Sequence, residues 1–251
     1  MPRQTVEEDD KHRSNPDVRP NEQNIARKPG DFATTPPQPR SFRTGFSRDF
    51  LKDYHSGVMQ YTYKGLSCLK SPIDLAVYML LIWDKRPATL IEIGSFKGGA
   101  AQFYYDITRN YGLATDIITV DFREINERAQ EESPIEFIQA DAIDLESSDL
   151  HERLKTAARP WLVIEDSAHT FGVTYSVLDY FRDRMNTGEM LIVEDGVIED
   201  QGANWRYDGG PNRAVHTFLQ EHPDSFEISS HYNDFFGVNV SFNPNGYLEK
   251  K

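Results

Sequence analysis

The sequence lacks the features of a disulfide-stabilised, membrane-spanning or nucleic-acid-binding protein. Its only cysteine, Cys68, cannot form an intrachain disulfide, which fits a reducing compartment. The longest apolar run, AVYMLLIW, is too short to span a bilayer, and the N-terminal segment MPRQTVEEDDKHRSNPD has no apolar core of a signal peptide. Lys and Arg number 27 against 40 Asp and Glu, so a cationic surface for nucleic acid is not expected. We therefore expect a cytoplasmic protein that acts on a small molecule.

The length of 251 residues suits one α/β domain with a tail. Residues 1–42 are rich in Pro, Asn and charged residues and poor in large aliphatic ones, which predicts a flexible polar arm. We assign residues 43–251 to the folded domain, with a helical cap over 43–86. Within this cap, Ser71 and Pro72 predict the start of a helix. We expect that helix to line one face with Leu75, Met79, Leu80 and Trp83.

Beyond residue 87, short apolar runs alternate with helical patterns, which is typical of parallel βαβ units. The predicted strands are 89–93, 116–120, 135–139, 161–165 and 189–194, and the predicted helices lie near 98–110, 147–158, 170–186 and 211–221. Two further strands, 226–232 and 235–242, follow one another without a helix and predict an antiparallel hairpin that turns near Asn233. This mostly parallel sheet with helices on both faces resembles the Rossmann-like class I methyltransferases.

A glycine turn, EIGSFKGG at 92–99, follows the first of these strands and opens a helix. The dinucleotide pattern G-x-G-x-x-G does not fit, because Phe96 stands two residues after Gly94. A phosphate loop does not fit either, because alanines follow the last glycine. The pattern E-x-G-x-x-x-G resembles the first motif of S-adenosylmethionine-dependent methyltransferases. It predicts cofactor contacts at Glu92, Gly94, Ser95 and Gly98.

The ends of the next two strands extend the predicted cofactor site. Asp121 stands where a carboxylate accepts hydrogen bonds from both ribose hydroxyls, although an NAD-binding protein would place an acid there as well. Asp141 and Ala142 stand where methyltransferases of this class meet the adenine. The alternative is an ordinary strand, turn and helix whose glycines serve tight packing.

Acidic residues close the fourth and fifth strands. Asp166 follows the fourth, and Glu194 with Asp195 follows the fifth, so all three are expected at one edge of the sheet beside the cofactor. Such carboxylates would repel one another unless a cation such as Mg²⁺ binds them. His169 follows Asp166 by three residues and is a candidate base for a substrate hydroxyl. The alternatives are solvated or Arg-paired acids and a histidine that serves as a helix cap.

These motifs together resemble the cephalosporin-hydroxylase-like family, which includes metal-dependent rhamnosyl and macrolide-sugar O-methyltransferases. The resemblance runs from Tyr63 to Tyr232 through YKGLSCLKSPIDL, IEIGSFKGGA, VIEDSAHT, MLIVEDGVI and GGPNRAVHTFLQEHPDSFEI. In the sugar methyltransferases of this family, the Asp of D-x-x-H and a Glu-Asp pair hold Mg²⁺, and the His is the proposed base. The resemblance therefore implies metal binding by Asp166, Glu194 and Asp195, and catalysis by His169 with Asp166, which also borders the methyl donor.

We accordingly expect an S-adenosylmethionine- and Mg²⁺-dependent O-methyltransferase that acts on a sugar, for example a rhamnose, or on a glycosylated secondary metabolite, and that forms a homo-oligomer. Tyr61, Tyr63 and Trp205 are candidate aromatic walls for the sugar, or ordinary packing residues. The competing hypotheses are an NAD-linked oxidoreductase, a non-catalytic cofactor-binding protein, and an accessory protein of an antibiotic hydroxylation system. His222, Asp224 and His231 superficially suggest an iron site, which nothing else supports.

Overall fold

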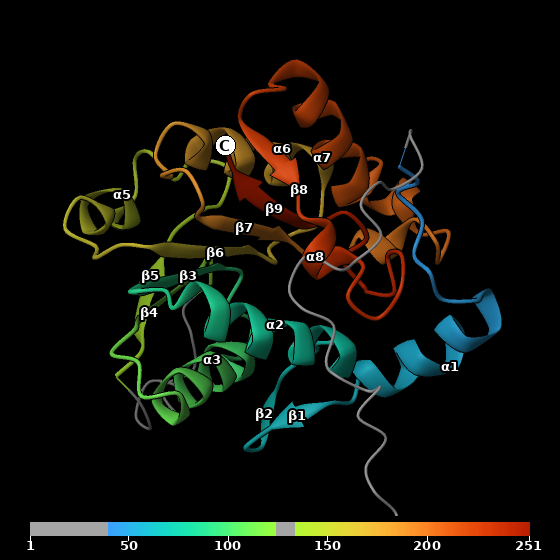
Figure 1. Ribbon diagram of the computed structural model, residues 1–251, viewed down its shortest axis with the longest axis horizontal. Coiled ribbons are helices and arrows are strands. Elements are labelled where there is room, and N and C mark those ends of the chain that lie inside the picture. The colour runs from blue at the N-terminus through green and yellow to red at the C-terminus, as the bar shows by residue number, and fades with distance from the viewer. Residues whose placement is uncertain (1–39, 124–133) are drawn as a thin grey trace, which may run out of the picture. The chain divides into compact units, whose positions relative to one another are not determined.

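The computed structural model describes residues 40–123 and 134–251 (Figure 1). Its elements in chain order are α1 (Arg48–Val58), β1 (Thr62–Tyr63), β2 (Leu66–Ser67), α2 (Pro72–Lys85), β3 (Thr89–Ile93), α3 (Gly99–Asn110), β4 (Asp116–Asp121), β5 (Glu136–Gln139), α5 (Asp149–Leu154), β6 (Trp161–Glu165), α6 (Phe171–Arg182), β7 (Met190–Val193), η1 (Gly196–Ile198), η2 (Asn204–Tyr207), α7 (Gly210–Glu221), β8 (Phe226–Ile228), α8 (Ser230–Asn233) and β9 (Tyr247–Lys250). Among the described residues, none of the helices has the length and apolar character needed to cross a membrane.

The central sheet has the strand order β5-β4-β3-β6-β7-β9-β8. The first five strands are parallel, and β9 runs antiparallel to both β7 and β8. This confirms the predicted class I methyltransferase sheet and its antiparallel C-terminal pair. Because the parallel strands all point the same way, their carboxyl ends meet along one edge, where the predicted site residues lie.

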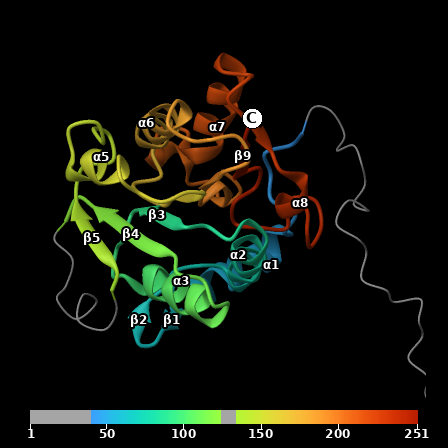
Figure 2. The same cartoon turned by 60° about the vertical axis from the view of Figure 1, so that its left-hand side comes forward.

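Helices cover both faces of this sheet, as Figure 1 and the turned view in Figure 2 show. Side chains alternate between the faces along each strand, so neighbouring residues of β3 belong to different cores. Ile91 and Ile93 pack with α5, α6 and α7, whereas Leu90 packs with α2 and α3. Burial on both faces explains why the strands read as continuous apolar runs in the sequence.

The strand predicted at 235–242 is wrong, because α8 ends at Asn233, an irregular segment follows it, and the last strand begins at Tyr247. Asn239 and Asn245 are buried at backbone φ angles of 53° and 59°, a left-handed conformation that asparagine tolerates. Their side chains bond the backbone oxygen of Ser41. Side-chain hydrogen bonds therefore replace a strand ladder here, and the apolar Phe236 and Val238 are exposed instead of paired.

Helix α2 begins as predicted, with the Ser71 side chain accepting a hydrogen bond from the Asp74 amide. Its buried face differs from the prediction, because Trp83 is 53% exposed while Asp74 and Tyr78 are buried. The reason is polar: the Asp74 carboxylate accepts bonds from Ser241, from the Phe242 amide and from the Tyr247 hydroxyl of the C-terminal segment. A pattern based on apolar residues cannot anticipate a buried carboxylate held by remote partners.

A short hairpin, β1 with β2, lies between α1 and α2 and was not predicted. It presses against the start of α3 so closely that a Cβ on Gly99 would stand 2.2 Å from the Ser67 carbonyl oxygen. This approach places the residues that follow β2, Cys68 to Lys70, beneath the carboxyl ends of the strands, where Lys70 and Cys68 are buried.

The described chain begins with a segment bound to the C-terminal part of the domain. The Arg40 guanidinium donates two hydrogen bonds to Asp234 at 2.7 and 2.8 Å and a third to the Asn245 side chain at 2.7 Å. The rest of the predicted arm, residues 1–39, lies outside the described residues. The last three residues of the predicted arm, 40–42, belong to the folded domain.

Candidate active site

The glycine turn lies directly against the end of β6. Gly94 has a φ of 111°, and a Cβ at this position would stand 2.0 Å from the Asp166 carbonyl oxygen. Only glycine allows this approach. The Asp166 amide in turn donates to the Ile93 carbonyl at 2.8 Å. The cofactor turn and the first acidic strand end are therefore one unit, as the sheet geometry predicted.

A cavity of about 540 Å³ opens beside this turn. Five of the predicted cofactor residues line it, namely Gly94, Asp121, Asp141, Ala142 and Asp166. The Asp121 carboxylate is fixed by the Phe96 amide at 2.9 Å and the Arg123 amide at 3.0 Å. Each carboxylate oxygen keeps lone pairs for further donors, so Asp121 can still accept two hydroxyl groups.

The other three predicted cofactor residues lie elsewhere. Gly98 lines neither of the two cavities described here and instead precedes α3 with a φ of 75°. Ser95 and Glu92 line the second cavity and are joined through Thr119, which donates to Glu92 Oε2 at 2.6 Å and lies 2.6 Å from the Ser95 hydroxyl. Glu92 is fully buried, and burial raises its pKa to about 7. Within residues 40–123 and 134–251, its other oxygen, Oε1, has no hydrogen-bond partner, so it can accept a further donor.

The second cavity, of about 470 Å³, adjoins the first, and Gly94, Asp166 and Ser167 line both. Its wall includes His169, Asp195, Arg206 and Tyr207. The predicted aromatic walls Tyr61, Tyr63 and Trp205 line neither cavity: Tyr63 packs edge-on against Phe103, and Trp205 is 73% exposed. Tyr207 takes their place, with its ring centroid 6.1 Å from that of His169.

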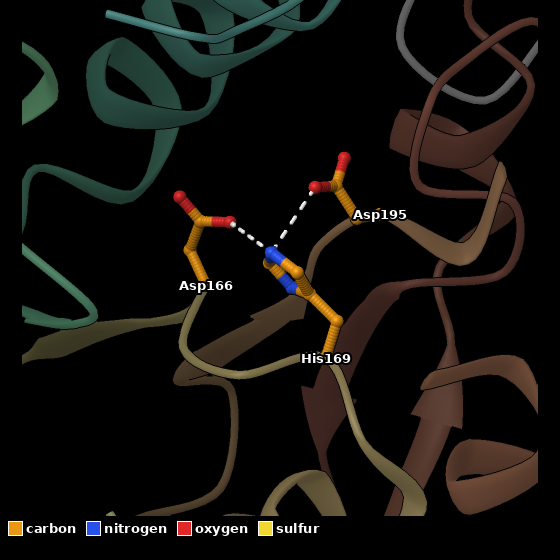
Figure 3. Close-up of side chains that lie close together, drawn as sticks. All are labelled: Asp166, His169 and Asp195. Atoms are coloured by element: carbon orange, nitrogen blue, oxygen red, sulfur yellow. Dashed lines mark ion pairs between the residues drawn. The ribbon is translucent and has the colours of Figure 1, made fainter. Parts of the chain in front are cut away.

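Asp166, His169 and Asp195 lie close together (Figure 3). All three line the second cavity, and Asp166 lines the first as well. His169 Nε2 lies 3.4 Å from Asp195 Oδ2 and 4.0 Å from Asp166 Oδ1, so the imidazole stands between the two carboxylates. His169 and Asp195 both have left-handed backbones, with φ angles of 56° and 59°. Such conformations cost about 1 kcal/mol or more for a non-glycine residue and gather at functional sites.

Glu194, the third predicted metal ligand, lies apart from this group. It is 4% exposed, and its Oε1 accepts from the Tyr78 hydroxyl at 2.6 Å and pairs with Lys70 Nζ at 2.7 Å. Burial, with help from Asp166, raises the pKa of Glu194 well above its ordinary value, and Lys70 opposes that shift. The structure therefore groups Asp166 and Asp195 with His169, whereas Glu194 is not part of that group and contacts Lys70.

Lys70 is the site residue that the sequence analysis missed. Its ammonium bridges Asp166 and Glu194. Burial alone would lower the pKa of Lys70, but these two carboxylates raise it well above its usual range. The available signal was its position just before the Ser71 cap, within the segment YKGLSCLKSPIDL that carries part of the family resemblance.

The group of Asp166, His169 and Asp195 fits a divalent cation. Among the described residues, one ligand atom each from Asp166, His169 and Asp195 can be chosen so that all lie within 4.8 Å of one another. Carboxylate oxygens are the ligands of Mg²⁺, and imidazole extends the set to softer metals. The adjoining 540 Å³ cavity with its acidic strand ends fits a nucleoside-bearing cofactor.

Comparison with known proteins gives a consistent result. Residues 55–251 match the model of the family described as Rhamnosyl O-methyltransferase/CmcI. A rhamnosyl O-methyltransferase of Mycobacterium tuberculosis H37Rv is 26% identical over 207 residues, which cover 80% of this chain and 84% of that protein. The corresponding enzyme of Mycobacterium leprae is 26% identical over 192 residues, covering 76% and 83%.

A solved structure of CmcI with Mg and SAM is 27% identical, with a TM-score of 0.60 over 77% of each chain. The family match and the sheet order decide between the two interpretations of the glycine turn in favour of the methyl donor over the dinucleotide. The chain therefore belongs to the rhamnosyl O-methyltransferase/CmcI family and is a methyltransferase.

Proposed function

We propose that the protein transfers a methyl group from S-adenosylmethionine to a hydroxyl of a sugar or a sugar-bearing small molecule, with a divalent cation at the junction of its two cavities. The observation that carries this proposal is the place of His169, which lines the 470 Å³ cavity between two carboxylates, one of which, Asp166, also lines the 540 Å³ cavity. A methyl donor in the first cavity and an acceptor in the second would meet at that histidine.

Each residue has a defined task in this proposal. Asp121 and Asp141 hold the nucleoside of the methyl donor, and Glu92 and Ser95 face its other end. Tyr207 offers a ring against which a sugar face can pack.

His169 accepts the proton of the acceptor hydroxyl at Nε2 while the hydroxyl oxygen takes the methyl group and the donor leaves as S-adenosylhomocysteine. The imidazolium that results lies beside Asp166 and Asp195, whose negative charges stabilise it. A divalent cation, when bound, supplies a lower pKa for a coordinated hydroxyl. Asp166 and Asp195 would hold that cation, and the place of Glu194 in the ligand set stays a prediction.

The proposal is tested by methyl transfer from radiolabelled S-adenosylmethionine to a panel of rhamnosides and other deoxysugar glycosides. Turnover should disappear with EDTA and return with Mg²⁺ or Mn²⁺. Asp195→Asn should abolish turnover and metal dependence, yet still bind S-adenosylhomocysteine. Asp183→Asn, at an exposed aspartate after α6, is the matched control and should keep wild-type turnover. Turnover that EDTA leaves unchanged would remove the metal from the proposal.

A second experiment isolates His169. His169→Ala should lower kcat by about 100-fold or more, the usual worth of a general base, with S-adenosylhomocysteine affinity unchanged. If the variant keeps the wild-type kcat, His169 is not the base.

The proposal includes a homo-oligomer. Its support is the exposure of large apolar side chains at Phe50 and Val238, which are 47% and 59% exposed. Light scattering at several protein concentrations measures the mass directly, and a monomer at all of them would refute this part.

A further inference from the structure

Lys70 occupies an unusual position for a lysine. Its side chain is 3% exposed, the most buried of the Lys and Arg side chains that form ion pairs within residues 40–123 and 134–251. The ammonium contacts Asp166 Oδ2 and lies 2.7 Å from Glu194 Oε1. A buried lysine is normally explained by structural need, yet both of its partners lie in the predicted metal site.

The contacts of Lys70 place it in direct competition with a divalent cation. A metal that bridges Asp166 and Glu194 would need the oxygens that the ammonium now holds. The Lys70 ammonium and a metal ion bound to the same carboxylates would repel one another strongly in this buried site. Metal entry therefore requires either that Lys70 move or that the metal use only the side of the cluster formed by Asp166, His169 and Asp195.

The same region offers the ammonium a second position. Glu92 Oε1 and Tyr104 Oη are both buried and have no hydrogen-bond partner within the described part of the chain. Glu92 lines the same cavity as Lys70, and the Tyr104 ring centroid lies 5.5 Å from that of Tyr78, whose hydroxyl donates to Glu194, a partner of Lys70. Two buried acceptors without donors are costly, and a displaced ammonium would satisfy them.

We propose that Lys70 is a resident cation that takes the place of the divalent ion in the metal-free enzyme and moves towards Glu92 and Tyr104 when the metal enters. This inference rests on the proposed function for the presence of a metal. Lys70 remains charged in both positions, so the carboxylate cluster is never left uncompensated. The lysine thereby keeps Asp166 and Glu194 in place for the metal and also weakens metal binding by competing for them.

The first test is the affinity of the purified, chelator-treated protein for Mn²⁺, measured by isothermal titration calorimetry. Lys70→Met should bind Mn²⁺ at least about 10-fold more tightly than wild type, because the competing charge is gone. The Mn²⁺ affinity of Lys70→Arg should stay near that of wild type. Lys85→Met is the matched control, because Lys85 pairs with Glu249 at 2.8 Å away from the site, and its affinity should not change.

Removing the buried cation also leaves two carboxylates unpaired, so metal-free Lys70→Met should melt below wild type. Saturating Mn²⁺ should then raise its Tm more than it raises that of wild type. If the methionine variant does not fold, Lys70→Gln serves in the same titration. Mn²⁺ affinity equal to or weaker than wild type in the folded variant would overturn the proposal, since Lys70 would then be a positioning group that assists the metal.

The second position has its own test in Tyr104→Phe, which removes one acceptor and keeps Lys70. This variant should bind Mn²⁺ several-fold more weakly than wild type, yet have no effect in the Lys70→Met background. An equal effect in both backgrounds, or none in either, would overturn the movement towards Tyr104.

The two proposals fail differently. If EDTA leaves turnover unchanged while Lys70→Met gains Mn²⁺ affinity, the metal-dependent function fails and Lys70 is the permanent cation of the site. If turnover depends on metal but Lys70→Met gains nothing, the function stands and the competition does not.

Discussion

Glu92 is a fully buried carboxyl group whose charge has consequences for stability. Burial raises its pKa to about 7 from an ordinary value of 4.5, although Lys70 and the Thr119 hydroxyl oppose the shift. Between these two values the folded protein holds a proton that the unfolded chain has released. Stability must therefore fall as the pH rises through this window. Glu92→Gln removes the titration and keeps an acceptor for Thr119.

The magnitude follows from the shift. Each pKa unit corresponds to 1.36 kcal/mol, so a rise from 4.5 to about 7 makes wild type lose about 3 kcal/mol relative to the variant across the whole window. Between pH 5.5 and pH 8, the accessible part of this difference is about 2 kcal/mol. The free energy of unfolding of the variant minus that of wild type should therefore be about 2 kcal/mol larger at pH 8 than at pH 5.5.

Urea denaturation at pH 5.5 and pH 8, in the absence of cofactor and metal, measures this difference directly. Glu227→Gln, at an exposed residue of β8, is the control and should follow wild type at both pH values. A stability difference between Glu92→Gln and wild type that is the same at both pH values would refute a proton on folded Glu92. A variant that loses stability relative to wild type between pH 5.5 and pH 8 would refute it as well, because folded wild type would then not hold the extra proton.

Three further variants examine the geometry of the site and its supports. Gly94→Ala should lower the free energy of unfolding by about 3 kcal/mol or more, measured by thermal or urea unfolding. The reason is that its methyl group would stand 2.0 Å from the Asp166 carbonyl oxygen at a φ of 111°. Normal stability would mean that the turn can move away. Arg40→Ala should lower the free energy of unfolding by roughly 3 kcal/mol in the same assay, because it leaves Asp234, 15% exposed, without its double hydrogen bond. A change below about 0.5 kcal/mol would show that water solvates this ion pair too well for it to stabilise the fold. Tyr207→Ala should raise the KM for the acceptor about 5-fold or more, because the ring contact is lost. Trp205→Ala should leave that KM unchanged, because Trp205 is 73% exposed and lies outside the cavities. Equal effects of the two substitutions would mean that Trp205 contacts the acceptor as well.

The parallel strands and the grouping of residues around the first cavity could be predicted because both follow from local rules. A buried parallel strand reads as an apolar run, and residues after such strands meet at one edge. Gly94, Asp121, Asp141 and Asp166 lie together for that reason alone. Pattern and topology suffice when the residue stands directly at the end of a strand.

The C-terminal segment and the cap could not be predicted in this way. The run FFGVNVSF has the composition of a strand, yet Phe236 is 51% exposed and the segment is held by side-chain bonds of Asn239 and Asn245. These bonds join residues about 200 positions apart, such as Ser41 and Asn245. No local pattern reports a partner at that separation.

The metal half of the site shows how charge alone can mislead. Carboxylates clustered at strand ends do require a compensating cation, and that inference from the sequence was sound. A cation need not be a metal, and the structure provides a buried ammonium in contact with Asp166 and Glu194. Lys70 follows the β1-β2 hairpin, which packs against Gly99, a contact that no pattern in the segment itself reports. A count of acids therefore predicts a positive charge, and only the tertiary contacts show that a lysine and a divalent ion would share the same ligands.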